Sequence, residues 1–224
     1  MKVLAVSPHL DDAVFSAGAT LAWHARQGDD VTVLTCLTGN VARPEGFALA
    51  CQLDKGLSPD VDYMALRRAE DRAACAAIGA QAVHWYHLEA PHRGYEDAPA
   101  LFAAARADDP LEEALARDFE ALFASLEYDV IYGPWGVGGH VDHLAVRRGL
   151  ESCRTDIVWW EDFPYAMRET AAPSGIERQC VSPQDLACKV DAALCYASQL
   201  DFQFGSPAKA RAVLRKWTVE GFAR

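Results

Sequence analysis

Two short segments of this chain carry side chains that can do metal chemistry. The first is 7–12, which reads SPHLDD, and the second is 138–143, which reads GGHVDH. Each holds imidazole and carboxylate groups, which bind zinc and similar divalent ions. Together they offer more groups than three metal ligands require, so that a carboxylate is left over to act as a general base toward water. The two segments therefore predict a hydrolytic metal site.

The elements expected around these segments would bring them together. Short apolar runs predict five strands, at 2–7, 31–37, 82–88, 129–135 and 156–160. Apolar residues at helical spacing predict helices at 13–27, 64–79, 111–126, from residue 140 to about 151, at 183–200, and after Ser206-Pro207. This alternation predicts an α/β protein with a Rossmann-like layered α/β/α fold, a mostly parallel sheet of at least five strands, and a single domain over 1–224. Both reactive segments follow a predicted strand, where ligands bind in such sheets.

Three long segments lack any helical or strand periodicity. They are 40–63, 89–110 and 161–182. Loops of this length are often functional. We expect them to choose the substrate, and one acid of the Glu161-Asp162 pair is expected to reach the site.

In the first segment, His9 lies three residues before Asp12 in a strand-to-helix turn. Both side chains can then point at one centre, while Asp11 faces elsewhere and remains free to act on water. The alternative is structural. Asp11 and Asp12 would then cap the following helix, where carboxylates accept N–H bonds and meet the positive end of the dipole.

In the second segment, His140 and His143 lie one turn apart. One can ligate a metal while the other faces substrate. Gly138 and Gly139 allow a sharp turn and close approach of the backbone. The alternative is a Gly-rich loop with exposed histidines and with Asp142 as a helix cap. The spacing is not HExxH, so a zincin helix is not indicated.

Taken jointly, these motifs resemble the PIG-L/LmbE-like zinc deacetylase family. The signatures are P-H-x-D-D, found as Pro8 to Asp12, and H-x-D-H, found as His140 to His143. Weaker matches are Arg67 to Glu70 and a terminal helix that carries Lys189, Tyr196, Ser198 and Gln199. The chain departs from the family at Leu10, often Pro, and at Ala13, often Glu.

The resemblance implies a role for each of five residues. His9, Asp12 and His143 would bind zinc, and this leaves one coordination position open, as catalysis requires. Asp11 would be the general base. A protonated His140 would stabilise the oxyanion. Whether Asp11 or His140 protonates the departing amine stays open.

Three further residues are candidates for supporting roles. Asp142 would orient His140 or His143 from behind, unless it only caps the helix. Arg67 is expected to contact polar groups of the substrate, unless it is a solvated charge. Trp135 flanks a predicted loop and could offer its face to a sugar ring.

The activity implied is a metal-dependent amide hydrolase that removes an N-acetyl group from an amino sugar of the N-acetylglucosamine type or from its conjugate. The cofactor would be Zn²⁺, although Fe²⁺, cobalt or manganese could occupy the same ligands. Two alternatives are a non-catalytic metal- or ligand-binding module on the same fold and an amidase of a thiol-sugar conjugate. A nucleotide-dependent oxidoreductase is disfavoured because no G-x-G-x-x-G follows the first strand.

Composition restricts partners and location. With 21 basic and 32 acidic residues, the formal net charge is −11, which disfavours nucleic acid. The first apolar run is too short for a signal peptide, and no run approaches the ~20 residues that span a bilayer. The seven cysteines are scattered and odd in number, typical of free thiols. We therefore expect a cytoplasmic protein with a small-molecule substrate and no membrane partner. The oligomeric state stays open, a homo-oligomer included.

Overall fold

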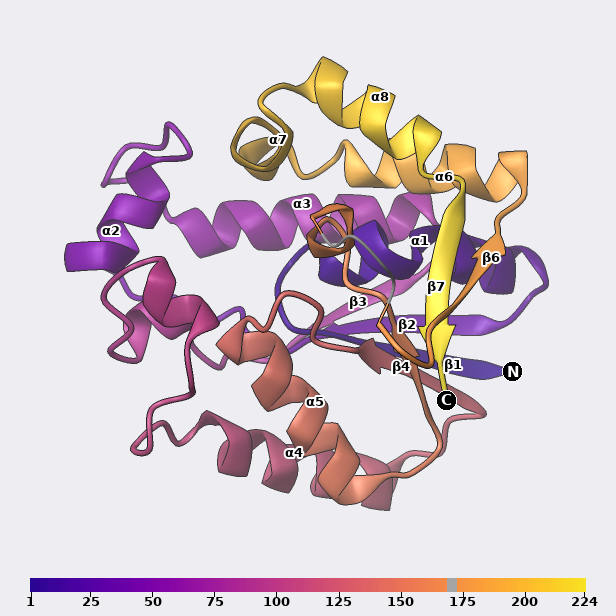
Figure 1. Ribbon diagram of the computed structural model, residues 1–224, viewed down its shortest axis with the longest axis horizontal. Coiled ribbons are helices and arrows are strands. Elements are labelled where there is room, and N and C mark those ends of the chain that lie inside the picture. Colours follow the sequence, from indigo (N-terminus) through magenta and orange to yellow (C-terminus); the bar gives the residue numbers. More distant parts are fainter. Residues whose placement is uncertain (169–172) are drawn as a thin grey trace.

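One seven-stranded sheet runs through the molecule in the order β3-β2-β1-β4-β5-β7-β6 (Figure 1). The computed structural model describes residues 1–168 and 173–224. Its strands are β1 (Lys2–Ser7), β2 (Asp30–Thr35), β3 (Gln81–His84), β4 (Val130–Pro134), β5 (Ile157–Trp160), β6 (Glu177–Cys180) and β7 (Val219–Ala223). The first five are parallel, whereas β7 is antiparallel to both β5 and β6. The predicted α/β fold with a mostly parallel sheet is confirmed.

Helices cover both faces of this sheet. They are α1 (Asp12–Arg26), α2 (Gly46–Leu53), α3 (Tyr63–Ala77), α4 (Leu111–Ser125), α5 (Val141–Cys153), α6 (Pro183–Ala193), α7 (Ala197–Phe204) and α8 (Pro207–Lys216). Short 3₁₀ turns lie at Ala90–His92, Pro99–Phe102 and Tyr165–Met167. Figure 1 shows α4 and α5 on one side of the sheet and α1, α3, α6 and α8 on the other.

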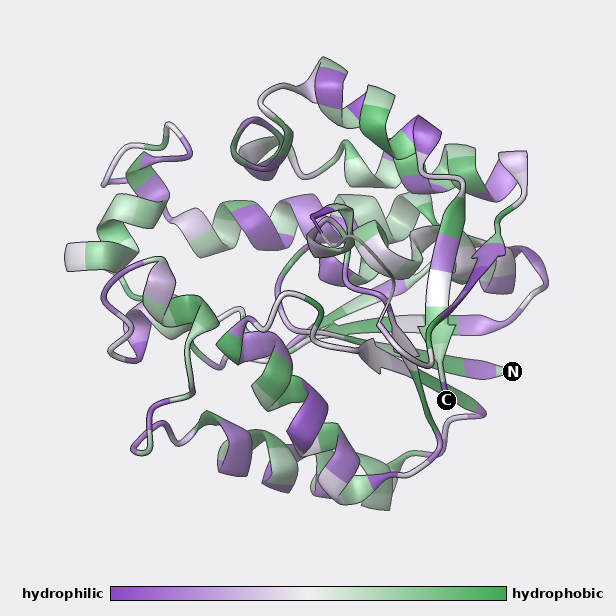
Figure 2. Cartoon of the chain, in the orientation of Figure 1, coloured by the Kyte–Doolittle hydropathy of each residue, from purple (hydrophilic) through white to green (hydrophobic). Residues whose placement is uncertain are grey.

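The central strand shows why three layers form. In β1, Val3 and Ala5 pack into a core cluster with α1, α3 and α6, whereas Leu4 and Val6 pack with α4 and α5. Alternate side chains of a strand point to opposite faces, so a continuous apolar run needs cover on both sides. Figure 2 accordingly shows hydrophobic residues along the central strands, and polar residues on the outer helices.

The structure differs from the sequence-based expectation at particular places. β3 ends at His84, because Tyr86 then forms an antiparallel bridge with Leu37 instead of continuing the parallel ladder. The helix expected at 183–200 is two helices, since the backbone of Tyr196 (φ −80°, ψ 54°) is not helical. The expected loops contain α2 and β6, and β7 follows the last helix without having been predicted.

The register of β1 against β4 positions the reactive segments. Val3 lies opposite Val130 and Ala5 opposite Tyr132 in parallel pairing. The carboxyl ends of the two strands are therefore neighbours, and α1 and α5 begin shortly beyond them. Both reactive segments thus open at the same edge of the sheet.

A buried ion pair attaches the C-terminal strand to α1. Lys189 Nζ on α6 donates to Glu220 Oε1 on β7 at 2.7 Å, and both side chains are buried. Glu220 also accepts the backbone N–H groups of Ala19 and Thr20 within α1. Every carboxylate oxygen has a partner here, as a buried charge requires.

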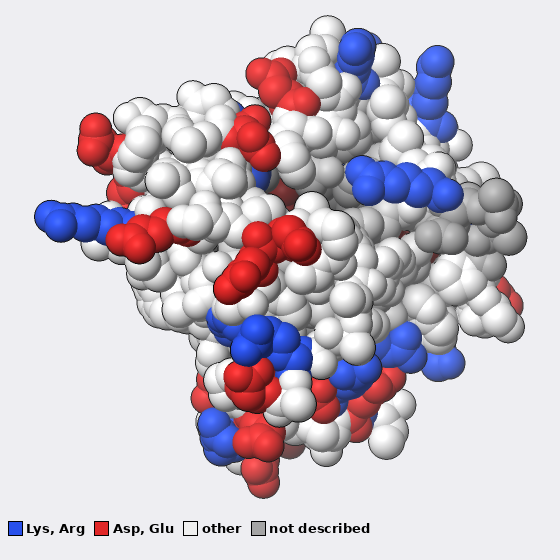
Figure 3. All heavy atoms as spheres, turned by 60° about the vertical axis from the view of Figure 1, so that its left-hand side comes forward, with Lys and Arg blue, Asp and Glu red and all other residues white. Residues whose placement is uncertain are grey.

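The surface charges and the cysteines are distributed as the composition suggested. Figure 3 shows Lys and Arg side chains interspersed with Asp and Glu on the face it presents. All seven cysteines are free, although Cys180 is exposed and only Cys36 and Cys75 are fully buried. Within 1–168 and 173–224, no helix has the length and apolar character that crossing a bilayer requires.

The buried pair yields a stability prediction. We expect Lys189→Met to lower the free energy of unfolding by about 3–5 kcal/mol, because it leaves the Glu220 charge buried without its partner. The control is Arg148→Met, which breaks the exposed pair with Glu112 (3.3 Å) and should cost less than about 1 kcal/mol. Urea unfolding measures both. Similar losses in the two variants would contradict the role given to the buried charge.

Candidate active site

The three predicted metal ligands converge at the carboxyl edge of the sheet. His9 and Asp12 follow β1, and His143 lies in the first turn of α5, after β4. One ligand atom from each lies within 4.8 Å of the other two. Three donors this close can share one divalent ion. The structure therefore brings together the set that the sequence analysis selected.

His143 tests whether these residues fit a cation. Its Nδ1 lies 2.8 Å from Asp162 Oδ1, while its Nε2 is buried, has no hydrogen-bond partner and lies 3.3 Å from Asp12 Oδ2. When Asp162 accepts the Nδ1 proton, the Nε2 lone pair faces the Asp12 carboxylate. A positive charge between the two resolves this opposition. The donor set therefore fits a divalent cation.

The electrostatics of the same residues point the same way. Burial disfavours the charged form of His143, but the carboxylates of Asp12 and Asp162 outweigh it and raise the pKa of His143 to about 9. The pKa of His9 is also raised: burial opposes this, but hydrogen bonds to Asp12 and Asp142 prevail. The space between these side chains attracts positive charge, whether a proton or a metal ion.

Asp162 is the acid of the loop after β5 that reaches the site. Its Oδ1 faces His143, and its Oδ2 accepts the N–H groups of Gly136 (2.7 Å) and Val137 (2.8 Å). Its neighbour Glu161 instead pairs with Arg178. Asp162 thus fixes both the ring of His143 and the backbone turn that leads to α5.

Asp142 contacts a different histidine from those expected. Its Oδ2 lies 2.9 Å from His9 Nε2 and accepts the N–H of Ala90, while its Oδ1 accepts from Arg93 at 2.7 Å. The expectation that Asp142 orients His140 or His143 is therefore corrected. The side chain that caps α5 is that of His140, which accepts the N–H of Asp142.

A second possible donor set, His9, His140 and Asp142, overlaps the first. It is the poorer metal site, because Arg93 and Ala90 already occupy the Asp142 carboxylate. Asp12 accepts one backbone N–H, that of His9, but among the described residues no Lys or Arg lies within 4 Å of its carboxylate. His9, Asp12 and His143 are therefore the better donor set.

Asp11 lies beside the donor set without belonging to it. Its Oδ1 is 3.5 Å from the guanidinium of Arg67, which is also paired with Glu89. Burial raises the pKa of Asp11 to about 7, and the nearby Arg67 opposes this shift. A carboxyl group whose pKa lies near neutrality can both accept and release a proton at physiological pH.

His140 lines the same cavity as a neutral imidazole. Its Nδ1 accepts the N–H of Asp142 at 3.2 Å, so the ring proton resides on Nε2. Burial lowers the pKa of His140 to about 3. Both observations favour a neutral ring with an Nε2–H donor over the expected imidazolium.

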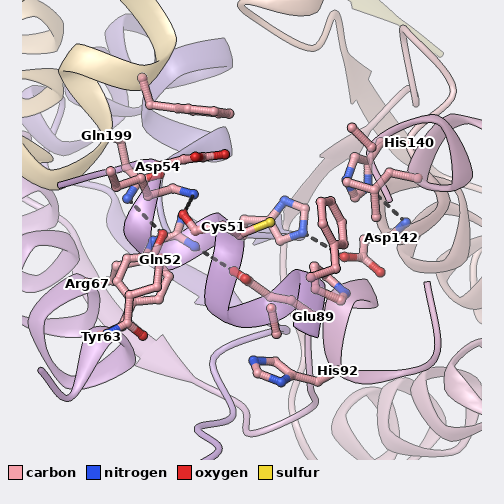
Figure 4. A pocket seen from close by; sticks show the side chains of 18 of the residues that line it. Cys51, Gln52, Asp54, Tyr63, Arg67, Glu89, His92, His140, Asp142 and Gln199 are labelled. Atoms are coloured by element: carbon pink, nitrogen blue, oxygen red, sulfur yellow. Dashed lines mark hydrogen bonds and ion pairs between the residues drawn. The ribbon is translucent and has the colours of Figure 1, made fainter. Parts of the chain in front are cut away.

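These side chains lie around a cavity of about 300 Å³. Figure 4 shows Arg67, Tyr63 and Gln199 on one side and His140 and Asp142 on the other. The segments expected to choose the substrate all contribute to its wall, as does α7. The lining residues from these regions include Asn40, Phe47, Lys55, Glu89, His92, Phe102, Tyr165, Gln199 and Phe202.

The two predicted substrate contacts have different outcomes. Arg67 lines the cavity. Trp135 does not: its ring packs beneath the guanidinium of Arg147, 4.2 Å from ring centroid to Cζ, and against the α4–α5 core cluster. Because its backbone N–H bonds to Trp160 O, the sheet hydrogen bonding continues through Trp135. The structure therefore does not place Trp135 in the wall of this cavity, where the sequence-based prediction expected it.

The site features described so far define a class: α/β proteins with a buried His/His/Asp site at the strand ends of a parallel sheet. The sequence profile described as PIG-L, GlcNAc-PI de-N-acetylase, matches residues 4–153. The chain therefore belongs to the PIG-L family.

Individual relatives lie at moderate identity. A 2'-N-acetylparomamine deacetylase of Streptomyces fradiae is 33% identical over 178 residues, covering 76% of this chain and 60% of the relative. A 1D-myo-inositol 2-acetamido-2-deoxy-alpha-D-glucopyranoside deacetylase of Mycobacterium sp. (strain KMS) is 32% identical over 156 residues, covering 66% and 48%. This chain thus matches only about half to three fifths of those relatives' length.

A solved structure resembles the whole chain. The crystal structure of a deacetylase–bog complex from the teicoplanin biosynthesis pathway has a TM-score of 0.85 and 28% identity, and the match covers 100% of this chain and 97% of that one. The correspondence includes the C-terminal elements that lie beyond the family profile.

The contacts of Asp162 predict its effect on metal affinity. We expect Asp162→Asn to weaken zinc binding about 10- to 100-fold. The single amide oxygen is needed by the N–H groups of Gly136 and Val137, so the amide NH2 group then faces His143 Nδ1, and the ring loses the acceptor that directs its Nε2 toward the site. Asp118→Asn is the matched control, since Asp118 also pairs with a histidine, His87 at 2.7 Å, but outside the cavity. Competition with a chromophoric chelator measures both. Equal affinities in the two variants would contradict the assignment.

Proposed function

We propose that this chain is a zinc-dependent N-deacetylase of amino sugars or their conjugates. The observation that carries the proposal is the close grouping of His9, Asp12 and His143 on one wall of a cavity, with Asp11 beside them and outside the donor set. A purely structural metal site has no use for an additional carboxyl group of this kind. Two nitrogen donors and one oxygen donor suit zinc and leave a position open for reactants.

In this proposal the chain's own groups manage the protons. When bound, the ion supplies Lewis acidity toward water and the amide carbonyl. Asp11 takes a proton as water attacks the carbonyl carbon, and it becomes a carboxylic acid. The C–N bond then breaks, and Asp11 gives this proton to the departing amine, so that a free amine and acetic acid leave. The acetic acid keeps the second proton of the water and releases it to the solvent as it becomes acetate. The raised pKa of Asp11 suits both steps.

His140 supports the transition state in a neutral form. Its Nε2–H donates to the oxygen that gains negative charge when the carbonyl carbon becomes tetrahedral. A neutral imidazole cannot release its remaining proton to an amine without becoming an anion. The sequence left open whether Asp11 or His140 protonates the departing amine. The neutral state of His140 favours Asp11 as this acid.

The substrate class follows from the relatives and from the cavity wall. The relatives are named for the deacetylation of N-acetylparomamine and of an acetamido-glucopyranoside of inositol. Asn40, Tyr63 and Gln199 provide polar groups in the cavity of this chain, and Phe47 and Phe102 provide apolar faces. Polar donors beside aromatic faces suit a sugar ring. We also propose that residues 1–224 act as one domain, since a single sheet includes strands from both ends.

The proposal is tested with metal-loaded protein and a panel of N-acetylated amino sugars and conjugates. Mass spectrometry should show the replacement of an acetyl group by hydrogen in at least one member. Asp11→Asn should retain zinc but lower kcat about 10²- to 10⁴-fold, because the general base is lost. Asp118→Asn is again the control. Full activity of Asp11→Asn would contradict the proposed mechanism. If no compound of the panel were deacetylated, the proposed substrate class would be wrong.

His140 gives a separate prediction. We expect His140→Ala to bind zinc with unchanged stoichiometry, while kcat falls about 10²- to 10³-fold, because one donor to the oxyanion is removed. Steady-state kinetics and metal analysis of the purified variant check this together. Loss of the metal in His140→Ala would instead identify His140 as a ligand.

A further inference from the structure

A second part of the cavity wall, the distal region, lies between α7 and α2 with the residues that follow α2. This distal region is lined by Phe47, Cys51 and Lys55 from one side and by Phe202 and Gln203 from the other. None of these residues belongs to the donor set or to the proposed proton chemistry. Their side chains are available to contact the part of a substrate that does not react.

Lys55 is the charged group that stands out in this distal region. Its ammonium donates to the carbonyl of Cys51 at 2.8 Å and lies 4.6 Å from the ring centroid of Phe202 and 5.5 Å from that of Tyr63. Within the part of the chain that the structure describes, no carboxylate oxygen lies within 4 Å of Lys55 Nζ. An ammonium has three N–H donors, so two remain for a ligand.

Two cations that are more deeply buried than Lys55 have carboxylate partners. The buried Lys189 pairs with Glu220 at 2.7 Å. In the cavity itself, Arg67 is paired with Glu89 and approaches Asp11. Around the half-buried Lys55, among the described residues, the carboxylates of Glu89 and Asp11 act on the ammonium only from beyond pairing distance.

The surroundings of Lys55 favour an anion over a neutral hydroxyl group. Aromatic faces stabilise a cation only modestly. Burial, and after it the charge of Arg67, lower the pKa of Lys55, and the carboxylates of Glu89 and Asp11 offset this only in part. This direction agrees with the lack of a paired carboxylate at Lys55 Nζ. A hydroxyl group of a ligand would accept a hydrogen bond from the ammonium of Lys55, but it would leave the positive charge without a counter-charge. A carboxylate or phosphate would satisfy the donors and neutralise the charge.

We propose that Lys55 binds an anionic oxygen group, a carboxylate or a phosphate, on the part of the substrate that lies away from the N-acetyl group. This inference rests on the proposed deacetylase function. It narrows the substrate class to amino-sugar conjugates that carry a negative charge. The N-acetyl group then lies at the donor set while the acid reaches the distal region.

The test compares three N-acetylglucosamine derivatives with metal-loaded protein: the carboxyethyl glycoside, its uncharged methyl ester, and the 1-phosphate. We expect the wild type to have a kcat/KM about 10- to 100-fold higher for a charged derivative than for the ester, because a hydrogen bond to a charged group contributes about 1.5–3 kcal/mol. The carboxylate and phosphate arms distinguish the two sources of negative charge.

Variants of Lys55 assign the preference to its ammonium. Lys55→Met should bring the ratio of charged to uncharged substrate close to one, mainly through KM, and Lys55→Arg should retain part of it. Lys209→Met, an exposed lysine on α8 outside the cavity, is the matched control and should keep the wild-type ratio. A wild type without preference, or a preference that survives in Lys55→Met, overturns the proposal.

Binding separates this inference from the proposed function. If no derivative is deacetylated, calorimetry with the same ligands gives the corresponding ratio of dissociation constants. Tighter binding of a charged derivative that depends on Lys55 would support the distal anion site although the deacetylase proposal had failed. Equal binding of charged and uncharged derivatives, or no binding, would overturn the inference.

Discussion

The sharing of one buried carboxylate, that of Asp12, between His9 and His143 is the interaction on which the rest of the site depends. Two imidazoles and an acid this close are stable only with positive charge among them. Asp162 bonds to the ring of His143, and Asp142 bonds to the ring of His9. Arg93 in turn balances the negative charge of Asp142. Each of these partners is itself buried and bonded. The proposed metal centre is therefore an inner shell of a larger network of charges.

Much of this arrangement could be predicted from the sequence because it depends on strand ends. Once the runs at 2–7 and 129–135 are taken as neighbouring parallel strands, His9, Asp12 and His143 must meet, and the observed pairing of β1 with β4 fulfils this. The strands that were missed lack the usual signal. β6 is exposed at all four positions, and β7 contains Glu220, whose burial becomes understandable only with Lys189 and α1 in place.

The hydrogen-bond partners of individual site residues could not be predicted in the same way. Asp142 lies one residue from His143 in sequence, yet it bonds to His9 because helix geometry turns the two side chains apart. The neutral state of His140 depends on its burial and on the N–H that it caps, neither of which spacing reveals. Trp135 was assigned to the cavity from its place beside a loop, whereas the pleat of the sheet turns its ring to the opposite side.

The segment 89–110 both lines the cavity and contacts the residues that hold the metal donor set in place. His92 and Phe102 form part of the cavity wall, while Arg93 and the N–H of Ala90 bond to Asp142, the residue behind His9. Evolution or engineering that exchanges this loop therefore also alters the contacts that support the proposed metal centre. A loop that replaces this one must keep an arginine at position 93 and a residue other than proline at position 90, so that both contacts with Asp142 are retained. This requirement limits how far the loop can diverge without loss of the proposed metal centre.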